Sequence, residues 1–309
     1  MSVGAEASGS GDSTVVHLPV SVVIATLGEP TLDATIATVN SGGHRPAEIL
    51  ICVPEDAWGD RPDWGDANVH VMRLPFRGQV RQRAAGFVAA TQPYVLQLDA
   101  DLILREGALR SLIAEIEDLG PSAAVAPVYV TADGRASAEF PAGVRGFGLS
   151  LANSILHGAP WGVKRMGAVG RSGQSFGVDP NRMTESRLAV QWLSGGCVLH
   201  RRENLVTQDF FPFPGKAYAE DLVHSRLLQE RGISLWVTRE AQCVIEKAEE
   251  SHALPELVRK YRADFYACRA NGIGVAWRGM RLLVCLARDL IGFASRLLRG
   301  RSRAWSARS

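Results

Sequence analysis

The segment Tyr94-Val-Leu-Gln-Leu-Asp-Ala-Asp101 joins an apolar run to two carboxylates. The run up to Leu98 is typical of a buried β-strand, and ligands of open α/β sheets bind beyond the carboxyl ends of such strands. Carboxylates placed there suit a hard divalent cation such as Mg²⁺ or Mn²⁺, which takes one or two of them together with substrate phosphates. A solvated turn is the alternative, and because the D-x-D spacing is common, the spacing alone favours the turn.

Strand-like and helix-like segments alternate on both sides of this segment. Apolar, β-branched runs predict strands over 20–26, 48–53, 68–74, 94–98, 123–130 and 234–238. Helical periodicity predicts helices over 32–39, 79–90, 106–119 and 220–231. The alternation predicts an α/β fold with a Rossmann-like, mostly parallel sheet flanked by helices. Residues 131–190 lack periodicity and are expected to form a functional loop or lid.

Composition excludes several classes of protein. The 309 residues carry 34 basic and 32 acidic side chains, a balance that argues against a nucleic-acid binder. The five cysteines form no C-x-x-C pair, which excludes a zinc finger and favours a reduced, cytoplasmic setting. Residues 1–17 have no basic or apolar region of a signal peptide and are expected to be a flexible lead-in. No apolar run approaches the roughly 20 residues of a membrane span.

A second acidic pair, Glu220-Asp221, opens the helix predicted over 220–231. Acidic side chains in a first turn complement the helix dipole, and that explanation suffices for a pair standing alone. However, the segment Trp192-Leu-Ser-Gly-Gly196 precedes it in the same part of the chain, and its small residues let another group approach the backbone closely. A carboxylate base needs such a cleft.

Five segments in this order resemble family 2 glycosyltransferases of the GT-A fold. They are Ser21-Val-Val-Ile-Ala-Thr26, Arg77-Gly-Gln-Val-Arg-Gln-Arg83, Leu98-Asp-Ala-Asp101, Trp192-Leu-Ser-Gly-Gly196, and Glu220-Asp221 with Arg226 and Gly232 after it. The resemblance covers about residues 18–240 and implies a GT-A domain over 18–245. It also implies inverting transfer from a nucleotide-diphosphate sugar, with a divalent cation, Mg²⁺ or Mn²⁺, on the diphosphate.

The resemblance also implies roles for individual residues. Those expected beside the nucleotide sugar are Thr26, Gly28, Glu29, Arg83 and Asp99. Asp99 and Asp101 would hold the metal, Asp221 with Glu220 beside it would be the general base, and the acceptor side would be shaped by Trp192, Gly195 and Gly196.

Two departures from the family pattern affect these expectations. Family members usually end the second strand with an aspartate that binds the base, whereas Val53-Pro54 stands here, with Glu55 or Asp56 as possible substitutes. The histidine that many relatives use as a further metal ligand has two competing counterparts, Glu246 and His252. A surface histidine is an equally simple interpretation of His252.

Other functions fit the sequence less well. Leu27-Gly-Glu-Pro30 cannot supply the G-x-G-x-x-G of a dinucleotide oxidoreductase, and Pro214-Gly-Lys-Ala lacks the Ser or Thr of a P-loop. The Q-x-x-R-W pattern of processive synthases is missing, which favours addition of one or a few sugars. A non-catalytic relative that binds a sugar or a partner is the remaining alternative. The missing strand-two aspartate supports it, and the two acidic motifs oppose it.

The last part of the chain, 246–309, is expected to be helical with a basic amphipathic tail. From Trp277 to Ser309 there are eight arginines and one aspartate. At about 100° per residue the arginines of 277–299 cluster on one side of a wide apolar face, a pattern typical of helices lying on anionic membranes. Packing on its own domain or on a second subunit is the alternative. The pattern predicts a peripheral protein on the inner face of the membrane with a lipid-linked acceptor.

Overall fold

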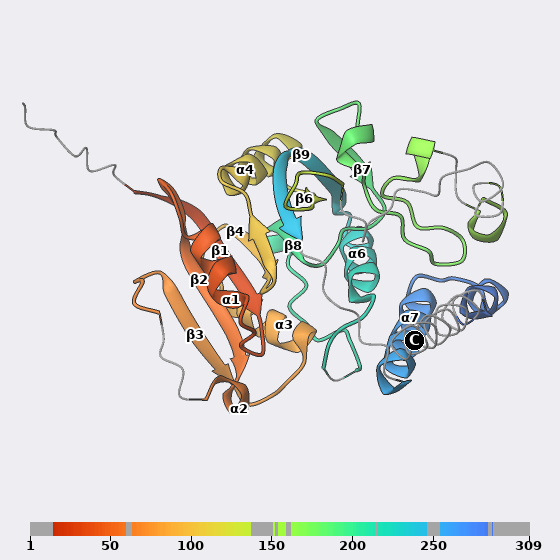
Figure 1. Cartoon of the computed structure of the whole chain (residues 1–309), viewed down its shortest axis with the longest axis horizontal. Helices are drawn as coiled ribbons and strands as arrows, with labels where there is room; N and C mark the ends of the chain where they lie inside the picture. The colour runs from red at the N-terminus through yellow and green to blue at the C-terminus, as the bar shows by residue number, and fades with distance from the viewer. Residues whose placement is uncertain are drawn as a thin grey trace, which may run out of the picture.

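The computed structural model describes residues 15–59, 64–136, 151, 154–158, 162–213, 215–245, 254–283 and 286. Its centre is a nine-stranded sheet in the order β3-β2-β1-β4-β8-β6-β9-β5, with β7 paired to β9. The strands are β1 (Val16–Ala25), β2 (His44–Pro54), β3 (Val69–Leu74), β4 (Tyr94–Asp99), β5 (Leu102–Leu104), β6 (Ala123–Val130), β7 (Arg187–Val190), β8 (Cys197–Arg201) and β9 (Ser234–Ile245). In Figure 1 the sheet extends from β3 on the left to β9 near the centre.

Helices cover both faces of the sheet, as the α/β pattern predicts. The longer helices are α1 (Leu32–Val39), α3 (Gln79–Ala89), α4 (Ala108–Leu119), α6 (Glu220–Glu230) and α7 (Leu254–Ala270), and α2 (Glu55–Trp58) is a single turn. Alternate residues of β1 face opposite layers: Val22 and Ile24 pack with α1 and α4, whereas Val23 packs beneath α3. This period of two explains why the strands are apolar throughout, since both of their faces are buried.

The first half of the sheet is parallel and the second half is mixed. β3, β2, β1 and β4 pair in parallel, and so do β6 and β9. β8 lies antiparallel between β4 and β6, while β5 and β7 add antiparallel pairings to β9. The predicted fold class is confirmed, and these antiparallel strands are the part that the periodicity did not indicate.

Strand β9 is longer than predicted. Its second half, beyond Thr238, pairs with β5 and with the last residues of β6. The register shifts between Pro127 and Val128, which is where the polar residues Arg239 and Glu240 interrupt the apolar pattern of β9. The same pairing takes Leu102–Leu104 into β5, so α4 begins at Ala108, two residues after the predicted start.

The C-terminal helix α7 packs on the body of the protein. In Figure 1 it lies to the right of the sheet, below α6. Its residues Ala263 and Ala267 are buried against side chains that include Phe210, Phe211, Leu222 and Val223. The predicted domain boundary after residue 245 stays a prediction. Among the described residues no helix is long and apolar enough to cross a membrane.

Candidate active site

A cavity of about 480 Å³ opens at the carboxyl ends of β1 and β4. These strands are neighbours at the point where the order of strands reverses, because β2 and β3 follow on one side and β4 lies on the other. Crevices at such switch points are where open α/β sheets bind ligands. The cavity is lined by Ala25, Thr26, Leu27, Glu29, Arg77, Gly78, Gln79, Gln82, Asp99, Ala100, Asp101, Gly215 and Lys216.

The turn after β1 forms one wall and is held by its own side chains. The Thr26 hydroxyl donates to the Glu29 carboxylate, which also accepts the Leu27 N–H at 3.1 Å. Gly28 N donates to Thr26 Oγ1 at 2.9 Å, and its φ of +88° is a conformation that favours glycine. Of the predicted residues, Thr26 and Glu29 line the cavity, and Gly28 shapes the turn without lining it.

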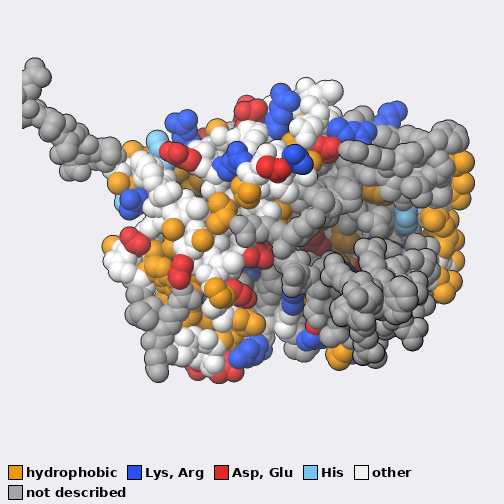
Figure 2. All heavy atoms as spheres, viewed as in Figure 1, with side chains coloured by type: hydrophobic (Ala, Val, Ile, Leu, Met, Phe, Trp, Pro, Cys, Tyr) orange, Lys and Arg blue, Asp and Glu red, His pale blue; other side chains and the backbone are white. Residues whose placement is uncertain are grey.

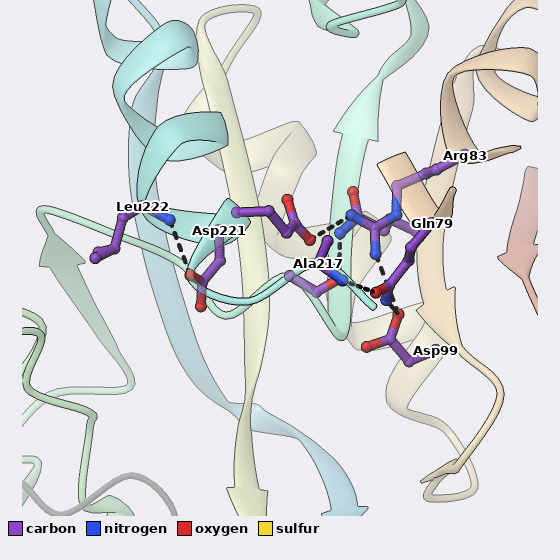
Figure 3. Close-up of polar contacts among 9 residues, drawn as sticks. Gln79, Arg83, Asp99, Ala217, Asp221 and Leu222 are labelled. Atoms are coloured by element: carbon purple, nitrogen blue, oxygen red, sulfur yellow. Dashed lines mark hydrogen bonds and ion pairs between the residues drawn. The ribbon is translucent and has the colours of Figure 1, made fainter. Parts of the chain in front are cut away.

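Arg83 on α3 is the electrostatic centre of the site. Its side chain is 4% exposed and forms ion pairs with Glu220 at 2.5 Å and with Asp99 at 3.2 Å. Burial would lower the pKa of this guanidinium, but the two carboxylates outweigh that effect and raise it. The resemblance implies a place for Arg83 beside the nucleotide, but its buried side chain is not among those that line the cavity. It lies behind the wall and connects Asp99 to the first turn of α6 (Figure 3).

Asp99 and Asp101 stand where β4 ends, as predicted, and both line the cavity. Asp99 Oδ1 accepts a hydrogen bond from Gln79 at 3.3 Å as well as the Arg83 ion pair. Burial raises the pKa of Asp99 to about 6, with Arg83 opposing the rise and the nearby Asp101 and Glu220 adding to it. Asp101 is exposed to the cavity.

The second acidic pair begins α6, and its two members differ. Glu220 is 4% exposed and binds Arg83 through Oε1, while its Oε2 is buried without a hydrogen-bond partner. Asp221 is half-buried, its Oδ1 accepts the Leu222 N–H at 2.9 Å, and burial followed by the charge of Glu220 raises its pKa to about 7. In Figure 3 the segment at Ala217 lies between Asp221 and Asp99. Asp221 is not among the residues that line the cavity.

The backbone immediately before this pair is strained. Ala219 has φ of +53°, and within the described chain no other non-glycine residue has a positive φ. Such a conformation costs an L-residue about 1–2 kcal/mol and is concentrated at functional sites. The strain lies at the start of the helix that carries Glu220 and Asp221.

Gly195 and Gly196 lie against the Glu220 and Asp99 carboxylates, whereas Trp192 is packed in the interior. Trp192 is 7% exposed and its indole N–H donates to the Phe176 carbonyl at 2.9 Å, so the ring is part of the packed interior. A Cβ on Gly195 would lie 2.6 Å from Glu220 Oε1, and one on Gly196 would lie 3.4 Å from Asp99 Oδ2. The two glycines leave space for the two acidic side chains. Their predicted acceptor-side role stays a prediction.

Four polar or charged residues of the cavity were not predicted individually. Gln79 bridges the walls, donating to Asp99 and accepting the Ala217 N–H at 3.2 Å. Gln82 donates to the carbonyls of Thr26 and Cys52, each at 2.8 Å. Arg77 and Lys216 add positive charge to the lining. Arg77, Gln79 and Gln82 belong to the segment 77–83 on which the family resemblance partly rests, whereas only the tertiary structure brings Lys216 to the cavity.

The expected substitute for the strand-two aspartate has a partner. Asp56 forms an ion pair with Arg77 at 3.0 Å, and both side chains are at least half exposed. Asp56 thus contacts Arg77, a residue of the cavity lining.

The two candidates for a further metal ligand, Glu246 and His252, lie outside the described residues. In the part of the chain that is described, no three His, Cys, Asp or Glu side chains gather as a metal site.

Comparison with known proteins bears on the family and on the fold. Residues 21–142 match the family model described as Glycosyl transferase family 2. A crystal structure of GalNAc-T7 with UDP, GalNAc and Mn²⁺ is similar over 81% of this chain, with 17% identity and a TM-score of 0.52. The chain covers 48% of that structure, about half its length. The crystal structure of a mycobacterial protein aligns with 82% of this chain and 75% of its own, at 17% identity and a TM-score of 0.48.

No curated protein matches the chain by sequence. The fold is similar to that of GT-A glycosyltransferases, as the resemblance implied. Residues 21–142 contain three of the five segments on which that resemblance rests, namely Ser21–Thr26, Arg77–Arg83 and Leu98–Asp101. Residues 21–142 therefore match family 2 glycosyltransferases, the family that the sequence resembles.

Proposed function

We propose that the protein is a metal-dependent, inverting glycosyltransferase that moves a sugar from a nucleotide-diphosphate sugar to an acceptor hydroxyl. The observation that carries the proposal is the cavity at the sheet's switch point, which Asp99 and Asp101 line together with the basic Lys216. The match to the family supports the donor class. The Mn²⁺ and UDP of the similar crystal structure are consistent with it.

The residues of the cavity fit a divalent cation. Oδ1 of Asp99 is occupied by the N–H donors of Gln79 and Arg83, which leaves Oδ2 for another ligand. Asp101 offers a second carboxylate to the same space. Mg²⁺ and Mn²⁺ commonly take one or two carboxylates and fill their other positions with water and substrate phosphates. Bound there, a cation would neutralise charge on the diphosphate leaving group.

Lys216 and Arg77 add to this charge compensation. Both side chains line the cavity, and their cationic groups would face a diphosphate entering between the β1 turn and the Gly215–Lys216 loop. Arg83 acts indirectly, because its ion pairs fix the orientation of the Asp99 carboxylate.

Asp221 is the proposed general base. The acceptor oxygen forms a bond to C1 of the sugar as the bond from C1 to the diphosphate breaks, and the hydroxyl proton passes to the Asp221 carboxylate. A single displacement inverts the configuration at C1. A base with a pKa of about 7 can both accept a proton near neutral pH and release it afterwards. Glu220 is committed to Arg83 and serves to position it.

The test is donor hydrolysis and transfer with Mg²⁺ or Mn²⁺, comparing the wild type with Asp221→Asn. Positioned proton transfer contributes about 10²–10⁴-fold, so the variant is expected to lose that much transfer rate while calorimetry shows unchanged donor binding. Asp101→Ala should instead lose metal-dependent donor affinity. A protein that binds nucleotide sugars without cleaving any of them would be the non-catalytic binding module instead.

We also propose that residues 277–299 bring the protein to an anionic membrane surface that presents a lipid-linked acceptor. Apolar side chains on and after α7 are exposed, among them Val275 at 71% and Leu283 at 69%. Figure 2 shows hydrophobic side chains along the right-hand edge of the molecule, where Figure 1 places the blue segment after α7 and also the green segment before β7.

Two of the tail's arginines have partners within the protein. Arg278 lies over the Phe265 ring, with Cζ 4.7 Å from its centroid, and Arg281 pairs with Asp264 at 2.6 Å. The membrane contact is therefore assigned to the exposed apolar residues and to the arginines beyond residue 286, which lie outside the described residues. Truncation after Asn271 should abolish co-sedimentation with anionic liposomes, and Leu283→Glu should weaken it. Equal sedimentation of the truncated and full chains would refute this proposal.

A further inference from the structure

A second cluster of cations lies away from the donor cavity, on residues 154–158 and 164–173 and the helical residues 275–283. Arg165 is 1% exposed, and the Arg281 side chain is 12% exposed. His157 is half-buried beside them, with its Nδ1 hydrogen-bonded to Ser172. Arg171 forms the outer rim, and its guanidinium carbon lies 3.9 Å from the centroid of the Trp277 ring.

Arg281 carries the clearest sign of a missing ligand. Its Nη2 pairs with Asp264 at 2.6 Å, but Nε and Nη1 are buried without a hydrogen-bond partner. Buried donors of a charged group are almost always satisfied, and an unpaired one commonly indicates an ion or water that belongs there. An anion would satisfy these donors and compensate the positive charge in the same step.

The electrostatic field in the cluster has the sign that an anion requires. The pKa of His157 is lowered by burial, then by Arg281 and then by Arg165, because both arginines repel a proton on the ring. Asp264 is the acidic side chain on the other side of Arg281, and its own pKa is raised by burial, with Arg281 and Lys260 opposing the rise. The side of Arg281 that faces His157 is thus positive.

Glycines bring the arginines close to the backbone. A Cβ on Gly173 would lie 3.3 Å from Arg281 Nη1 and only 2.4 Å from Cys268 Sγ, and one on Gly158 would lie 2.6 Å from Arg171 Cδ. Both glycines have positive φ, +81° and +62°. The local backbone is therefore built so that these two side chains can pack against it.

We propose that this cluster is a phosphate-binding site, with Arg281 as its main donor and Arg165, His157 and Arg171 around it. Three arginines and a histidine match a multiply charged phosphate better than a carboxylate. Ile155 and Leu283, each two residues from a member of the cluster, are exposed, and so is Leu151. These apolar side chains suit a phosphate carried by a lipid headgroup, although a free phosphate presents the same oxygens. The site is separate from the donor cavity and goes beyond the proposed transferase activity.

The test measures the pKa of the His157 imidazole by NMR in EDTA, with chloride and inorganic phosphate compared at matched ionic strength. His157→Gln assigns the signal. A bound phosphate should raise this pKa by offsetting the two arginines. Vesicles of phosphatidic acid, compared with phosphatidylcholine, test the lipid source: a shift with these vesicles alone assigns the site to a lipid phosphate. No shift with either probe overturns the proposal.

Variants separate binding from a structural role. Arg281→Lys keeps a positive charge opposite Asp264 but removes the unpaired donors, so phosphate affinity should fall about tenfold. Arg171→Gln should weaken binding severalfold, and circular dichroism checks that the fold survives the loss of its contact with Trp277. Arg226→Lys, on the exposed face of α6, is the control. Affinity unchanged in both Arg281→Lys and Arg171→Gln would refute the assignment. Donor hydrolysis depends on the other cavity, so its failure would leave this result intact.

Discussion

Replacing Arg83 by methionine is the sharpest test of the electrostatics at the donor cavity. The methionine fills most of the space but removes the ion pairs at 2.5 Å to Glu220 and at 3.2 Å to Asp99. Removing one member of a buried ion pair typically costs about 3–5 kcal/mol, because the remaining charge is left buried and uncompensated. Here two carboxylates lose the same partner. We expect a loss in that range at pH 8.

The loss should depend on pH in a definite direction. The pKa of Asp99 is already raised to about 6 in the folded protein, above its value in an unfolded chain, and without Arg83 it should rise further. The folded variant then binds more protons than its unfolded chain, so its stability increases as the pH falls. Destabilisation by Arg83→Met should therefore be smaller at pH 5.5 than at pH 8.

Urea unfolding followed by circular dichroism at both pH values measures this difference. Arg226→Met is the control, because its exposed i,i+4 pair with Glu230 contributes only about 0.3–0.5 kcal/mol. Adding Glu220→Gln to Arg83→Met should restore part of the stability, since it removes one of the stranded charges. A loss below about 1 kcal/mol at pH 8, or an equal loss at both pH values, would show that the carboxylates do not depend on Arg83.

Two further outcomes are expected. Gly195→Ala should destabilise the fold by about 1–3 kcal/mol, since the new Cβ would lie 2.6 Å from Glu220 Oε1. Gly43→Ala, with open space around the new Cβ, should be near neutral, and thermal unfolding of the two variants measures the difference. Stabilisation by Mn²⁺, measured by a thermal-shift titration, should be greater at pH 8 than at pH 5, because protons compete with the cation for Asp99. The stabilisation should disappear in Asp101→Ala. A metal effect that does not depend on pH would contradict the assignment.

A strand or helix could be predicted from the sequence where its own pattern of apolar residues matches its burial. Ala123–Val130 is apolar at every position and is buried at every position, so its bounds were predicted correctly. The antiparallel strand β5 has only three residues and exists because β9 continues past Thr238 to pair with it. A strand that short has no period to detect, and its pairing partner lies more than a hundred residues away.

The same distinction applies to the site. Asp99 and Asp101 were predicted because a strand and its end are visible in one short segment. The small residues of 192–196 predicted space for another group, but not that Gly195 makes it for Glu220, because the two residues meet only in the tertiary structure. Lys216 likewise reaches the cavity through a loop without periodicity. Contacts between distant segments are the part that one sequence does not encode in a readable pattern.

Gln82 gives the cavity a property that its carboxylates do not share. This buried amide joins the carbonyls at the ends of β1 and β2 through two hydrogen bonds of 2.8 Å, and it has no proton to gain or lose near neutral pH. The side of the cavity built on it should keep its shape over a pH range in which Asp99 and Asp221 change charge. For a working transferase, the KM contribution of that side should stay level with pH while kcat rises with ionisation of the base.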